Sequence, residues 1–505
     1  MPCNAAAGAR FACGEREAMP DSTYDVAVIG TGATGASIAR RLAAYTLRVV
    51  LLERCADVCF GVSKANSGII HAGFHHPTSS LKARLEIRGN LMFEQLHHEL
   101  GFPFKRVGIV VAAFSYEEMK TIEQLYSQGI ENGVPRLEIC GRDRMLLLEP
   151  KLNPDVVGGL YAPTGGIIEP YRYVFALVES AVQNGVTLRT RFAVTGVRHE
   201  GESFEIESAG GERVRARYAV NAAGLYADEV SAVFGAEHFS ITPRKGEEFL
   251  LERNAAGFPN HVIFPVPGRH TKGVLVIPTV EGTMMVGPTA VEQEDKEDRS
   301  TTAENLDRVF AQATHMVPVI SRREIITAFA GLRPVLENND FYIAISEERP
   351  HFIQAAGIQS PGLTASPAIA EYVKDLLKQA GLTLTEKADY EPTLVPHPRV
   401  REQGPEALEG LVRQDPRYGH LVCRCERVSE AEVVEAIQHG HTTLDGIKFY
   451  TRAGMGRCQG GFCTYKILKI LARETGMPVE ELTKRGDGSQ LVLGRLSAGT
   501  LETES

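Results

Sequence analysis

The chain has 505 residues, 43% of them hydrophobic, which is enough to form the cores of about two to four domains. Its net charge of −9 gives no reason to expect a nucleic-acid partner. The sequence has no apolar run of about 18 residues and no secretory signal. The nine cysteines are too few for a disulfide scaffold. These features predict a cytoplasmic protein with no transmembrane segment, which could associate with a membrane only through a partner.

Residues 1–22 are rich in alanine and glycine and lack hydrophobic periodicity, so we expect a disordered extension there. The first organised element is the apolar run Val26–Ile29, which predicts a strand buried on both faces. It leads into a GxGxxG motif formed by Gly30, Gly32 and Gly35. The first glycine permits a tight turn, the second lets a pyrophosphate approach the backbone, and the third lets helix and strand pack closely.

The helix after this motif, in whose first turn Thr34 lies, presents free N–H groups to bound phosphates. Glu53 ends the second strand 18 residues after Gly35, where an acid binds a ribose hydroxyl, and Arg54 follows it. This unit predicts a dinucleotide site rather than a simple glycine turn. The motif does not separate FAD from NAD, but its N-terminal position and single occurrence favour FAD as a resident cofactor.

Small and polar residues dominate the loop 61–73, as expected of a segment that passes close to a cofactor. Ser63, Asn66 and Ser67 can form hydrogen bonds with a flavin or its phosphates. His71 has two interpretations. It is either a satisfied buried histidine or a catalytic group against the flavin ring that polarises the substrate or accepts a proton.

This loop and the segment Ser79–Arg84 resemble the D-amino-acid-oxidase-type superfamily of FAD oxidoreductases, and at this point L-2-hydroxyglutarate dehydrogenases most of all. The stretch Tyr161–Gly185 instead resembles the large subunit of anaerobic glycerol-3-phosphate dehydrogenase. The resemblance implies a glutathione-reductase-like FAD-binding domain. It also implies that two further segments meet the FAD, a strand with Val194 at the adenine and a strand end at Ala223 and Gly224.

The remaining periodicity predicts a strand over 107–113 and helices over 86–100, 116–132, 170–184 and 365–378. After residue 241 the pattern changes to short strands separated by glycine and proline, at 246–252, 262–266, 273–278 and 283–287. Such a run predicts a mostly antiparallel sheet that forms a cap over the flavin. The charged stretch 291–308 is interpreted as a solvated loop that leads into a helix.

Arg333 precedes a proline and is therefore held extended, two residues after Gly331. The resemblance implies that Gly331 contacts FAD and that Arg333 lies in the substrate cavity and binds an anion. The fork of an arginine suits a carboxylate or a phosphate. Arg244 and Lys245, at the entrance of the predicted cap, are either surface charges or alternative anion-binding groups.

The segment Phe352–Thr364 is the last FAD element that the resemblance implies, with Gly362, Leu363 and Thr364 at the cofactor. Its glycine-rich turn puts a helix N-terminus near the flavin pyrimidine, where reduction develops negative charge. Glycerol-3-phosphate dehydrogenases carry a Gly-Gly-Lys turn here with a substrate-facing lysine. This chain carries Gln359-Ser-Pro-Gly instead, as L-2-hydroxyglutarate dehydrogenases do.

Four cysteines near the C-terminus form a C-x-C pair and a C-x₄-C pair, separated by 32 residues: Cys423, Cys425, Cys458 and Cys463. Four thiolates can hold an iron–sulfur cluster or Zn²⁺, although C-x-C is a poor fit to structural zinc. The segment Thr451–Cys463 resembles the bacterioferritin-associated-ferredoxin-like [2Fe-2S] module, which also ends the large subunit of anaerobic glycerol-3-phosphate dehydrogenase. Ser429 and Glu432 form a capping-box pattern that opens a helix between the two pairs.

The predicted fold is α/β: a glutathione-reductase-like FAD-binding Rossmann domain with an α+β antiparallel-sheet cap and a small helical [2Fe-2S] domain. The oxidoreductase part is expected over 23–380 and the [2Fe-2S] domain over 416–482, joined by a linker at 381–415 and followed by a disordered tail at 483–505. Within the oxidoreductase part, the FAD-binding segments are about 23–85, 150–240 and 326–380, and the cap segments are about 86–149 and 241–325.

The leading hypothesis is an FAD-dependent dehydrogenase of a small anionic secondary alcohol that passes electrons through the cluster to an acceptor protein or companion subunits. Glycerol 3-phosphate is favoured over L-2-hydroxyglutarate or another 2-hydroxy acid because the cluster domain and the 161–185 stretch point to it. Two alternatives remain: an amine or amino-acid oxidase of the same superfamily, and an electron-transfer or regulatory subunit without its own substrate.

Overall fold

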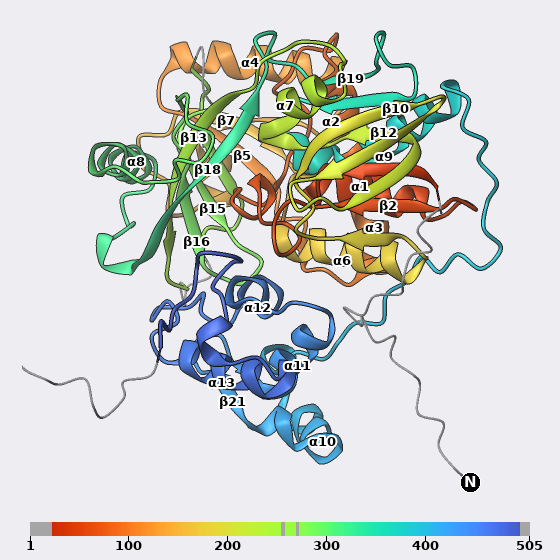
Figure 1. Ribbon diagram of the computed structural model, residues 1–505. Coiled ribbons are helices and arrows are strands. Elements are labelled where there is room, and N and C mark those ends of the chain that lie inside the picture. The colour runs from red at the N-terminus through yellow and green to blue at the C-terminus, as the bar shows by residue number, and fades with distance from the viewer. Residues whose placement is uncertain (1–22, 254–257, 269–271, 495–505) are drawn as a thin grey trace, which may run out of the picture. The chain divides into compact units, whose positions relative to one another are not determined.

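The computed structural model describes residues 23–253, 258–268 and 272–494 (Figure 1). The described chain forms two compact units, a larger one of residues 23–54 and 58–396 and a smaller one of residues 55–57 and 397–494. Among the described helices, none is both long and apolar enough to cross a membrane. The extension expected over residues 1–22 lies outside the described residues.

The centre of the larger unit is an eight-stranded sheet in which β1 pairs in parallel with β2 and β12, and β12 pairs in parallel with β20. The continuous apolar runs of β1 and β2 suit strands that are covered on both faces. The strands are β1 (Tyr24–Ile29), β2 (Val49–Leu52), β9 (Thr187–Arg189), β10 (Val194–Glu200), β11 (Ser203–Ser208), β12 (Arg213–Asn221), β19 (Tyr342–Ile345) and β20 (Phe352–Ala356).

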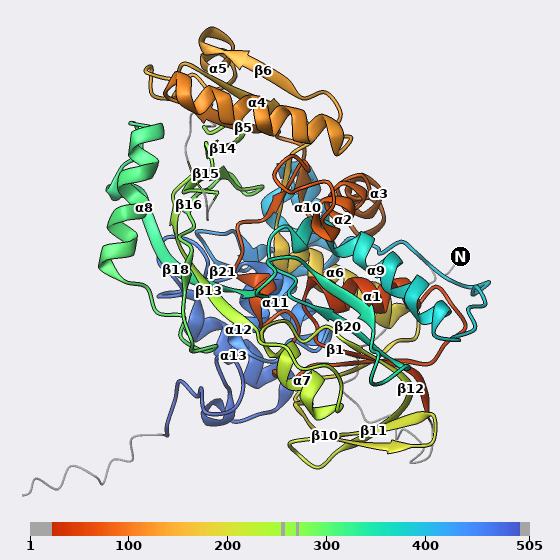
Figure 2. The same cartoon turned by 90° about the horizontal axis from the view of Figure 1, so that it is seen from above.

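Helices α1 and α9 lie side by side against this sheet (Figure 2). Their small residues allow the close approach, since Ala36, Ala39, Ala365 and Ala368 are fully buried. Helix α6 packs against α1 on its other side. The predicted Rossmann-type arrangement of a parallel sheet and covering helices is confirmed. The helices around this sheet are α1 (Ala33–Leu42), α6 (Pro170–Gln183), α7 (Ala227–Val233) and α9 (Gly362–Gln379), with the 3-10 turns η1 (Val62–Lys64) and η2 (Gly224–Tyr226).

A second, nine-stranded sheet forms the cap, and only its β5–β14 pair is parallel. Along β5 the buried residues alternate, with Val110 in one core and Ile109 and Val111 in the other, so both faces of the sheet are covered. The strands are β5 (Ile109–Ala113), β6 (Glu138–Gly141), β7 (Gly158–Ala162), β13 (Thr242–Leu251), β14 (Val262–Pro265), β15 (Leu275–Pro278), β16 (Met284–Gly287), β17 (Val291–Glu292) and β18 (Ile325–Val335).

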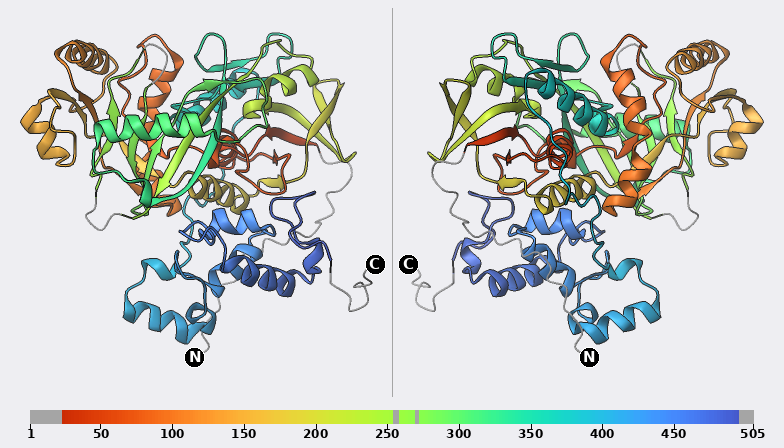
Figure 3. Two further views of the ribbon diagram at one scale, coloured as in Figure 1. Left: turned by 90° about the vertical axis from the view of Figure 1, so that its left-hand side faces the viewer. Right: turned by 90° about the vertical axis from the view of Figure 1, so that its right-hand side faces the viewer.

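Helices cover the cap sheet, with α8 lying across β13 and β16 as the green helix of Figure 3. The antiparallel cap is therefore as predicted, and within it β18 pairs with β13 along its length. The remaining cap elements are α4 (Tyr116–Glu131), α5 (Arg142–Leu148), α8 (Ala303–Met316) and η3 (Arg322–Glu324).

A small three-stranded sheet of β3 (Ile69–Ile70), β4 (Phe104–Lys105) and β8 (Gly166–Ile168) completes the larger unit. The single helix expected over 86–100 is two helices, α2 (Leu81–Asn90) and α3 (Phe93–Leu100). Helix α2 begins earlier than predicted because the hydroxyl of Ser80 accepts a hydrogen bond from the Ala83 amide and caps it. Gly89 of α2 lets this helix contact α9, where a Cβ atom would overlap the Thr364 carbonyl.

The smaller unit is mostly helical, as predicted. The capping box is confirmed, because Ser429 and Glu432 exchange side-chain and backbone hydrogen bonds at the start of α11. Buried Val433, Leu468 and Leu471 join α11 and α13 in one core. The elements are α10 (Pro405–Gln414), α11 (Glu430–Gln438), α12 (Leu444–Thr451), α13 (Cys463–Thr475), β21 (Leu421–Cys423), β22 (Val428–Ser429), η4 (Val400–Glu402), η5 (Pro416–Gly419) and η6 (Val479–Glu481).

Two irregular segments differ from their sequence-based descriptions. The stretch interpreted as a linker without periodicity contains α10, which Pro405 can open because a helix needs no N–H at its first position. Part of the tail expected to be disordered is ordered in its described residues. Thr483 forms a β-bridge with Gln490, and the Lys484 ammonium pairs with Asp445 at 2.9 Å, which ties this segment to α12.

Candidate functional site

The glycine turn between β1 and α1 has the geometry of a phosphate-binding turn. Gly30 has a φ of +105°, which favours glycine. A Cβ atom on Gly35 would overlap the Gly30 carbonyl oxygen, whereas one on Gly32 would meet only Ser63 Oγ, at 3.0 Å. No side chain caps α1 at Gly32, although the Ala33 amide donates to Ser63 Oγ at 2.8 Å. The turn thus keeps one open face at the positive end of the helix, which suits a pyrophosphate.

Glu53 lies directly against this turn. Its side chain is buried, and Oε2 accepts hydrogen bonds from the amide of Thr31, at 3.0 Å, and from the Thr31 hydroxyl. Arg54 points elsewhere: its guanidinium lies 3.8 Å from the centre of the Tyr226 ring and pairs with Glu297 at 3.0 Å. The assignment of both residues to the cofactor stays a prediction.

The strand end at Ala223 and Gly224, which was predicted to meet the cofactor, lies beside the same turn. A Cβ atom on Gly30 would come within 2.5 Å of the carbonyl oxygen of Ala222, so the segment that continues through Ala223 into Gly224 lies next to the glycine turn. Val194 opens β10 and packs on the core beneath this region, while Thr34 occupies the first turn of α1. The structure therefore brings Gly30, Ala223 and Gly224 together.

The loop 61–73 is held by its own side chains. Asn66 donates to the Ser63 carbonyl at 2.5 Å and accepts from the Gly68 amide at 2.8 Å. Ser67 donates to Glu248 Oε1 at 2.9 Å. Gly331 of β18 passes so close to this loop that a Cβ atom there would overlap the Ala65 carbonyl oxygen. Asn66 and Ser67 thus have protein partners, and their contact with a flavin stays a prediction.

His71 is buried beside the turn that precedes α9. Its amide donates to Thr364 Oγ1 at 2.9 Å, and its Nε2 lies 3.2 Å from Ser360 Oγ. The side chain of Asn90 donates to its carbonyl at 2.7 Å. Burial, followed by the positive charge of Lys272, holds the pKa of His71 well below its ordinary value. The imidazole is therefore neutral near pH 7 and has the protonation state of a general base.

Lys272 is the main residue that sequence reasoning missed. It precedes β15 in the cap, and its Nζ lies 3.5 Å from Ser360 Oγ. A chain of polar atoms therefore runs from Lys272 through Ser360 to His71. Burial lowers the pKa of Lys272 to about 8, and the carboxylate of Glu86 opposes this shift. No motif surrounds Lys272 in the sequence, so only the fold reveals its position.

Glu86 is a second residue that the sequence did not reveal. Its carboxyl oxygens are both buried, and a hydrogen bond from the Gly73 amide is one of the interactions that hold its pKa down. Burial raises its pKa to about 7, although the charges of Lys272 and Lys82 lower it. Lys82 is itself buried, its pKa is lowered to about 8 mainly by burial, and it donates to the Asn339 carbonyl. One carboxyl group and two ammonium groups therefore share a poorly solvated region.

Arg333 lies in the same electrostatic region, since its charge lowers the pKa of Lys272. Its two terminal nitrogens each donate to the Thr289 carbonyl at 3.2 Å. The guanidinium stacks over Gly246, where a Cβ atom would come within 2.6 Å of Arg333 Nη2. Burial raises the pKa of Glu248 to about 7, and Arg333 is one of the groups that oppose this shift.

The two cations at the predicted cap entrance already have acidic partners. Arg244 pairs with Glu292 at 2.7 Å, and Lys245 pairs with Asp298 at 2.5 Å. Lys245 is buried rather than a solvated surface charge. These ion pairs make both residues weaker candidates than Arg333 or Lys272 for holding a substrate anion.

In the smaller unit the four predicted metal ligands converge. The Sγ atoms of Cys423 and Cys425 are 3.7 Å apart, and those of Cys425 and Cys458 are 3.8 Å apart. The thiol of Cys463, at the start of α13, interacts with that of Cys423 and has a lowered pKa for this reason. Four thiols so close together, without a disulfide, have the donor set and spacing of an iron–sulfur or zinc site.

Comparisons with known proteins agree with this geometry. The family model "FAD dependent oxidoreductase" matches residues 25–376, and the model "BFD-like [2Fe-2S] binding domain" matches residues 421–473. The glycerol 3-phosphate dehydrogenase of Caloramator mitchellensis is 42% identical over 473 residues, which cover 93% of this chain and 98% of that protein. One subunit of the anaerobic glycerol-3-phosphate dehydrogenase of Escherichia coli K12 is 26% identical over 89% of this chain and 88% of its own length.

Among solved structures, the L-alpha-glycerophosphate oxidase of Mycoplasma pneumoniae with FAD bound superposes with a TM-score of 0.71 at 31% identity. The match covers 75% of this chain and 100% of that protein. The predicted resemblance is therefore confirmed over both units. The match to the cluster-domain model also favours [2Fe-2S] over zinc at the four cysteines.

Proposed function

Because the chain belongs to the FAD dependent oxidoreductase family and carries a BFD-like [2Fe-2S] binding domain, we propose that it is a glycerol 3-phosphate dehydrogenase. Its cofactors are FAD and a [2Fe-2S] cluster. In the reaction, glycerol 3-phosphate loses a hydride from C2 and a proton from its C2 hydroxyl and becomes dihydroxyacetone phosphate. The near full-length relationship to the Caloramator protein supports this substrate over a 2-hydroxy acid.

We propose the following residues as the ones that hold the two cofactors. The FAD would lie against Gly32, the glycine whose Cβ position is almost open, and along the start of α9 at Gly362, Leu363 and Thr364. The cluster would be bound by the four cysteines. When bound, FAD supplies a hydride acceptor and the cluster a one-electron site for onward transfer. The remaining chemistry depends on the chain's own residues.

His71 is proposed to take the proton of the substrate hydroxyl. Its imidazole is neutral, and its main chain is fixed on both sides, by Thr364 at the amide and by Asn90 at the carbonyl. Ser360 contacts Nε2 and can orient the ring or pass on the proton. A histidine positioned in this way typically contributes about 10²–10⁴-fold to a proton transfer.

The observation that carries the substrate assignment is the position of Lys272. The chain lacks the Gly-Gly-Lys turn of glycerol-3-phosphate dehydrogenases, but the Lys272 ammonium reaches the same turn from the cap, 3.5 Å from Ser360 Oγ. The charge of Lys272 acts on His71, and the charge of Arg333 acts on Lys272, so we propose that these two cations hold the substrate anion. A phosphate dianion matches two cations better than a single carboxylate does.

The electron acceptor is proposed to be a companion subunit or another protein. The Escherichia coli relative is named as one subunit of its enzyme, which supports an assembly of this kind. We further propose a cytoplasmic location, since the described cysteines are free thiols, as is usual in a reducing compartment.

Anaerobic bleaching of the flavin tests the function. The purified protein is mixed with glycerol 3-phosphate, L-2-hydroxyglutarate, glycerol or an amino acid in the absence of oxygen. Rapid bleaching by glycerol 3-phosphate alone is expected. Bleaching by L-2-hydroxyglutarate or by an amino acid instead would contradict the substrate assignment while leaving the family intact.

A further inference from the structure

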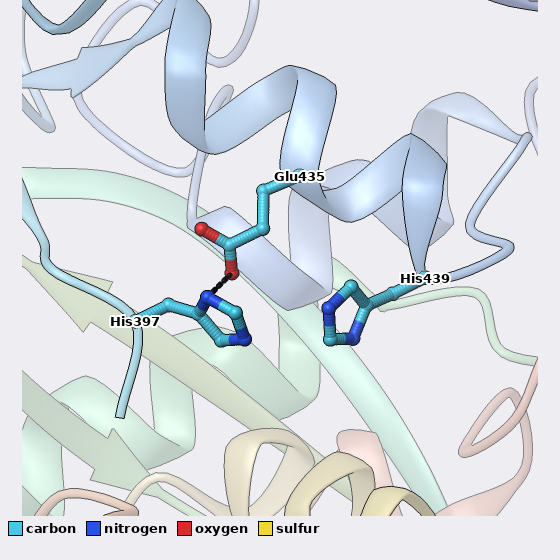
Figure 4. Close-up of side chains that lie close together, drawn as sticks. All are labelled: His397, Glu435 and His439. Atoms are coloured by element: carbon cyan, nitrogen blue, oxygen red, sulfur yellow. Dashed lines mark ion pairs between the residues drawn. The ribbon is translucent and has the colours of Figure 1, made fainter. Parts of the chain in front are cut away.

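Apart from the four cysteines, the smaller unit contains a second group of side chains whose types can serve as metal ligands. His397, Glu435 and His439 point toward one another (Figure 4), and one ligand atom from each lies within 4.8 Å of the others. Glu435 lies in α11 and His439 caps its C-terminal end. Residues four apart share one face of a helix, so α11 presents both side chains to His397.

The distances suit a small divalent cation. Nδ1 of His397 is 3.3 Å from Glu435 Oε1. Around a tetrahedral zinc ion with bonds of about 2.0–2.1 Å, neighbouring ligand atoms are about 3.3 Å apart. The rings of His397 and His439 are nearly perpendicular, at 87°, with centroids 5.0 Å apart. Small side-chain rotations would bring the third ligand atom to the same spacing.

A fourth residue positions two of the three ligands. The hydroxyl of Tyr450 lies 3.2 Å from Glu435 Oε1 and 3.4 Å from His439 Nδ1. Groups that hydrogen-bond to metal ligands fix their orientation and tautomer and increase metal affinity. Tyr450 belongs to α12, so the cluster draws on three separate parts of the smaller unit: the segment before η4, α11 and α12.

We propose that His397, Glu435 and His439 form a binding site for one Zn²⁺ ion, with a fourth position for water. Two imidazoles and one carboxylate favour zinc over magnesium or calcium, which prefer oxygen ligands. Because His397 is the first residue of the smaller unit's main segment, the bound ion cross-links the start of that segment to α11. Because the zinc ion would bind the folded unit and not the unfolded chain, it would raise the free energy of unfolding of this unit.

Zinc binding to the intact holoprotein tests this proposal. The full chain, with flavin and iron retained, is treated with a mild chelator, titrated with zinc chloride by calorimetry, and analysed for zinc and iron after gel filtration. One zinc per chain is expected in addition to the iron. His439→Ala and Glu435→Gln should each weaken binding by about 100-fold or more, and Tyr450→Phe by about 10-fold, as for a lost outer contact.

His420 provides a matched control. Its Nδ1 pairs with Glu430 Oε2 at 3.2 Å, which is the same type of histidine–glutamate contact as that of His397 with Glu435. Within the described ranges, however, no third ligand joins this pair. His420→Ala should leave zinc affinity unchanged. Zinc should also raise the unfolding temperature of the wild type and not that of His439→Ala.

Several results would overturn the proposal. They are the absence of zinc binding in the wild type, equal binding in wild type and both ligand variants, or zinc uptake matched by loss of iron. The last would place the zinc at the cysteines. Iron content and circular dichroism show whether a variant is folded. Flavin bleaching by substrate reports on the proposed dehydrogenase activity separately.

Discussion

The ammonium group of Lys272 and the hydroxyl of Ser360 lie 3.5 Å apart, although the two residues are 88 positions apart in the chain. Lys272 comes from the cap, whereas Ser360 belongs to the turn that opens α9. This contact joins the cap to the predicted FAD element at one point. It is the basis of the first two predictions.

Replacing Lys272 with methionine should weaken substrate binding without affecting the cofactor. Methionine keeps most of the side-chain volume but removes the charge, and losing one partner of a poorly solvated anion costs about 2–5 kcal/mol. KM for glycerol 3-phosphate should therefore rise by about 30-fold or more, with flavin content unchanged. Lys120→Met is the control, since Lys120 is an exposed lysine of α4 that pairs with Glu117. An unchanged KM in Lys272→Met would place the phosphate elsewhere.

The pH dependence of kcat/KM should show an alkaline limb near pH 8. The free enzyme's Lys272 has a pKa of about 8, so it is charged below this pH and loses its proton, and its attraction for the phosphate, above it. The pKa of His71 lies well below its ordinary value, so His71 should produce no acid limb near pH 6.5. The alkaline limb should disappear in Lys272→Met. Persistence of the limb in this variant would assign it to another group.

Replacing His71 with asparagine should slow the chemical step. Asparagine can keep the contact with Ser360 but cannot accept the proton, so the rate of anaerobic bleaching at saturating substrate should fall by about 10²–10⁴-fold. The dissociation constant of the substrate should change little. His98→Asn, which alters a histidine of α3, is the control. A normal bleaching rate in His71→Asn would leave His71 as a buried histidine with a structural role only.

Gly32→Val should give a folded protein without flavin. A Cβ atom at this position meets only the Ser63 hydroxyl, at 3.0 Å, but it projects where a pyrophosphate would lie. Gly35→Val should instead prevent folding, because a Cβ atom there overlaps the Gly30 carbonyl oxygen. Absorbance of the flavin and circular dichroism separate the two outcomes. A fully yellow Gly32→Val protein would contradict the FAD-binding role of the turn.

Cys458→Ser should remove the cluster and spare the flavin. An alkoxide is a poor replacement for a soft thiolate, so iron should fall from about two atoms per chain toward zero. Substrate should still bleach the flavin in a single turnover, whereas electron transfer to an external acceptor should fail. Cys140→Ser is a control, since Cys140 is a buried thiol of the cap sheet. One zinc per chain in the wild-type cysteine site would contradict the electron-transfer role.

Features with a local signal could be predicted from the sequence. The glycine turn, the capping box at Ser429 and the cap strands each follow from residue spacing. The pairing of β18 with β13 could not be predicted, because the β18 run contains alanine, glycine and proline and carries no local signal for its partner strand. Lys272 and Glu86 were missed for a different reason. They carry no motif, and their pKa shifts arise from burial and from partners distant in sequence.

Lys272 and the turn at Ser360 come from different parts of the larger unit, the cap and the start of α9, so the two parts can change independently. In the proposed enzyme the charge that selects the substrate comes from a cap segment, while the turn that opens α9 lies at the predicted FAD site and contacts His71. Substitutions in the cap can therefore alter the range of acids and phosphates accepted without loss of the flavin. In such a protein, substrate specificity can change through the cap while the FAD-binding segments stay the same. The cap is therefore the natural starting point for laboratory evolution.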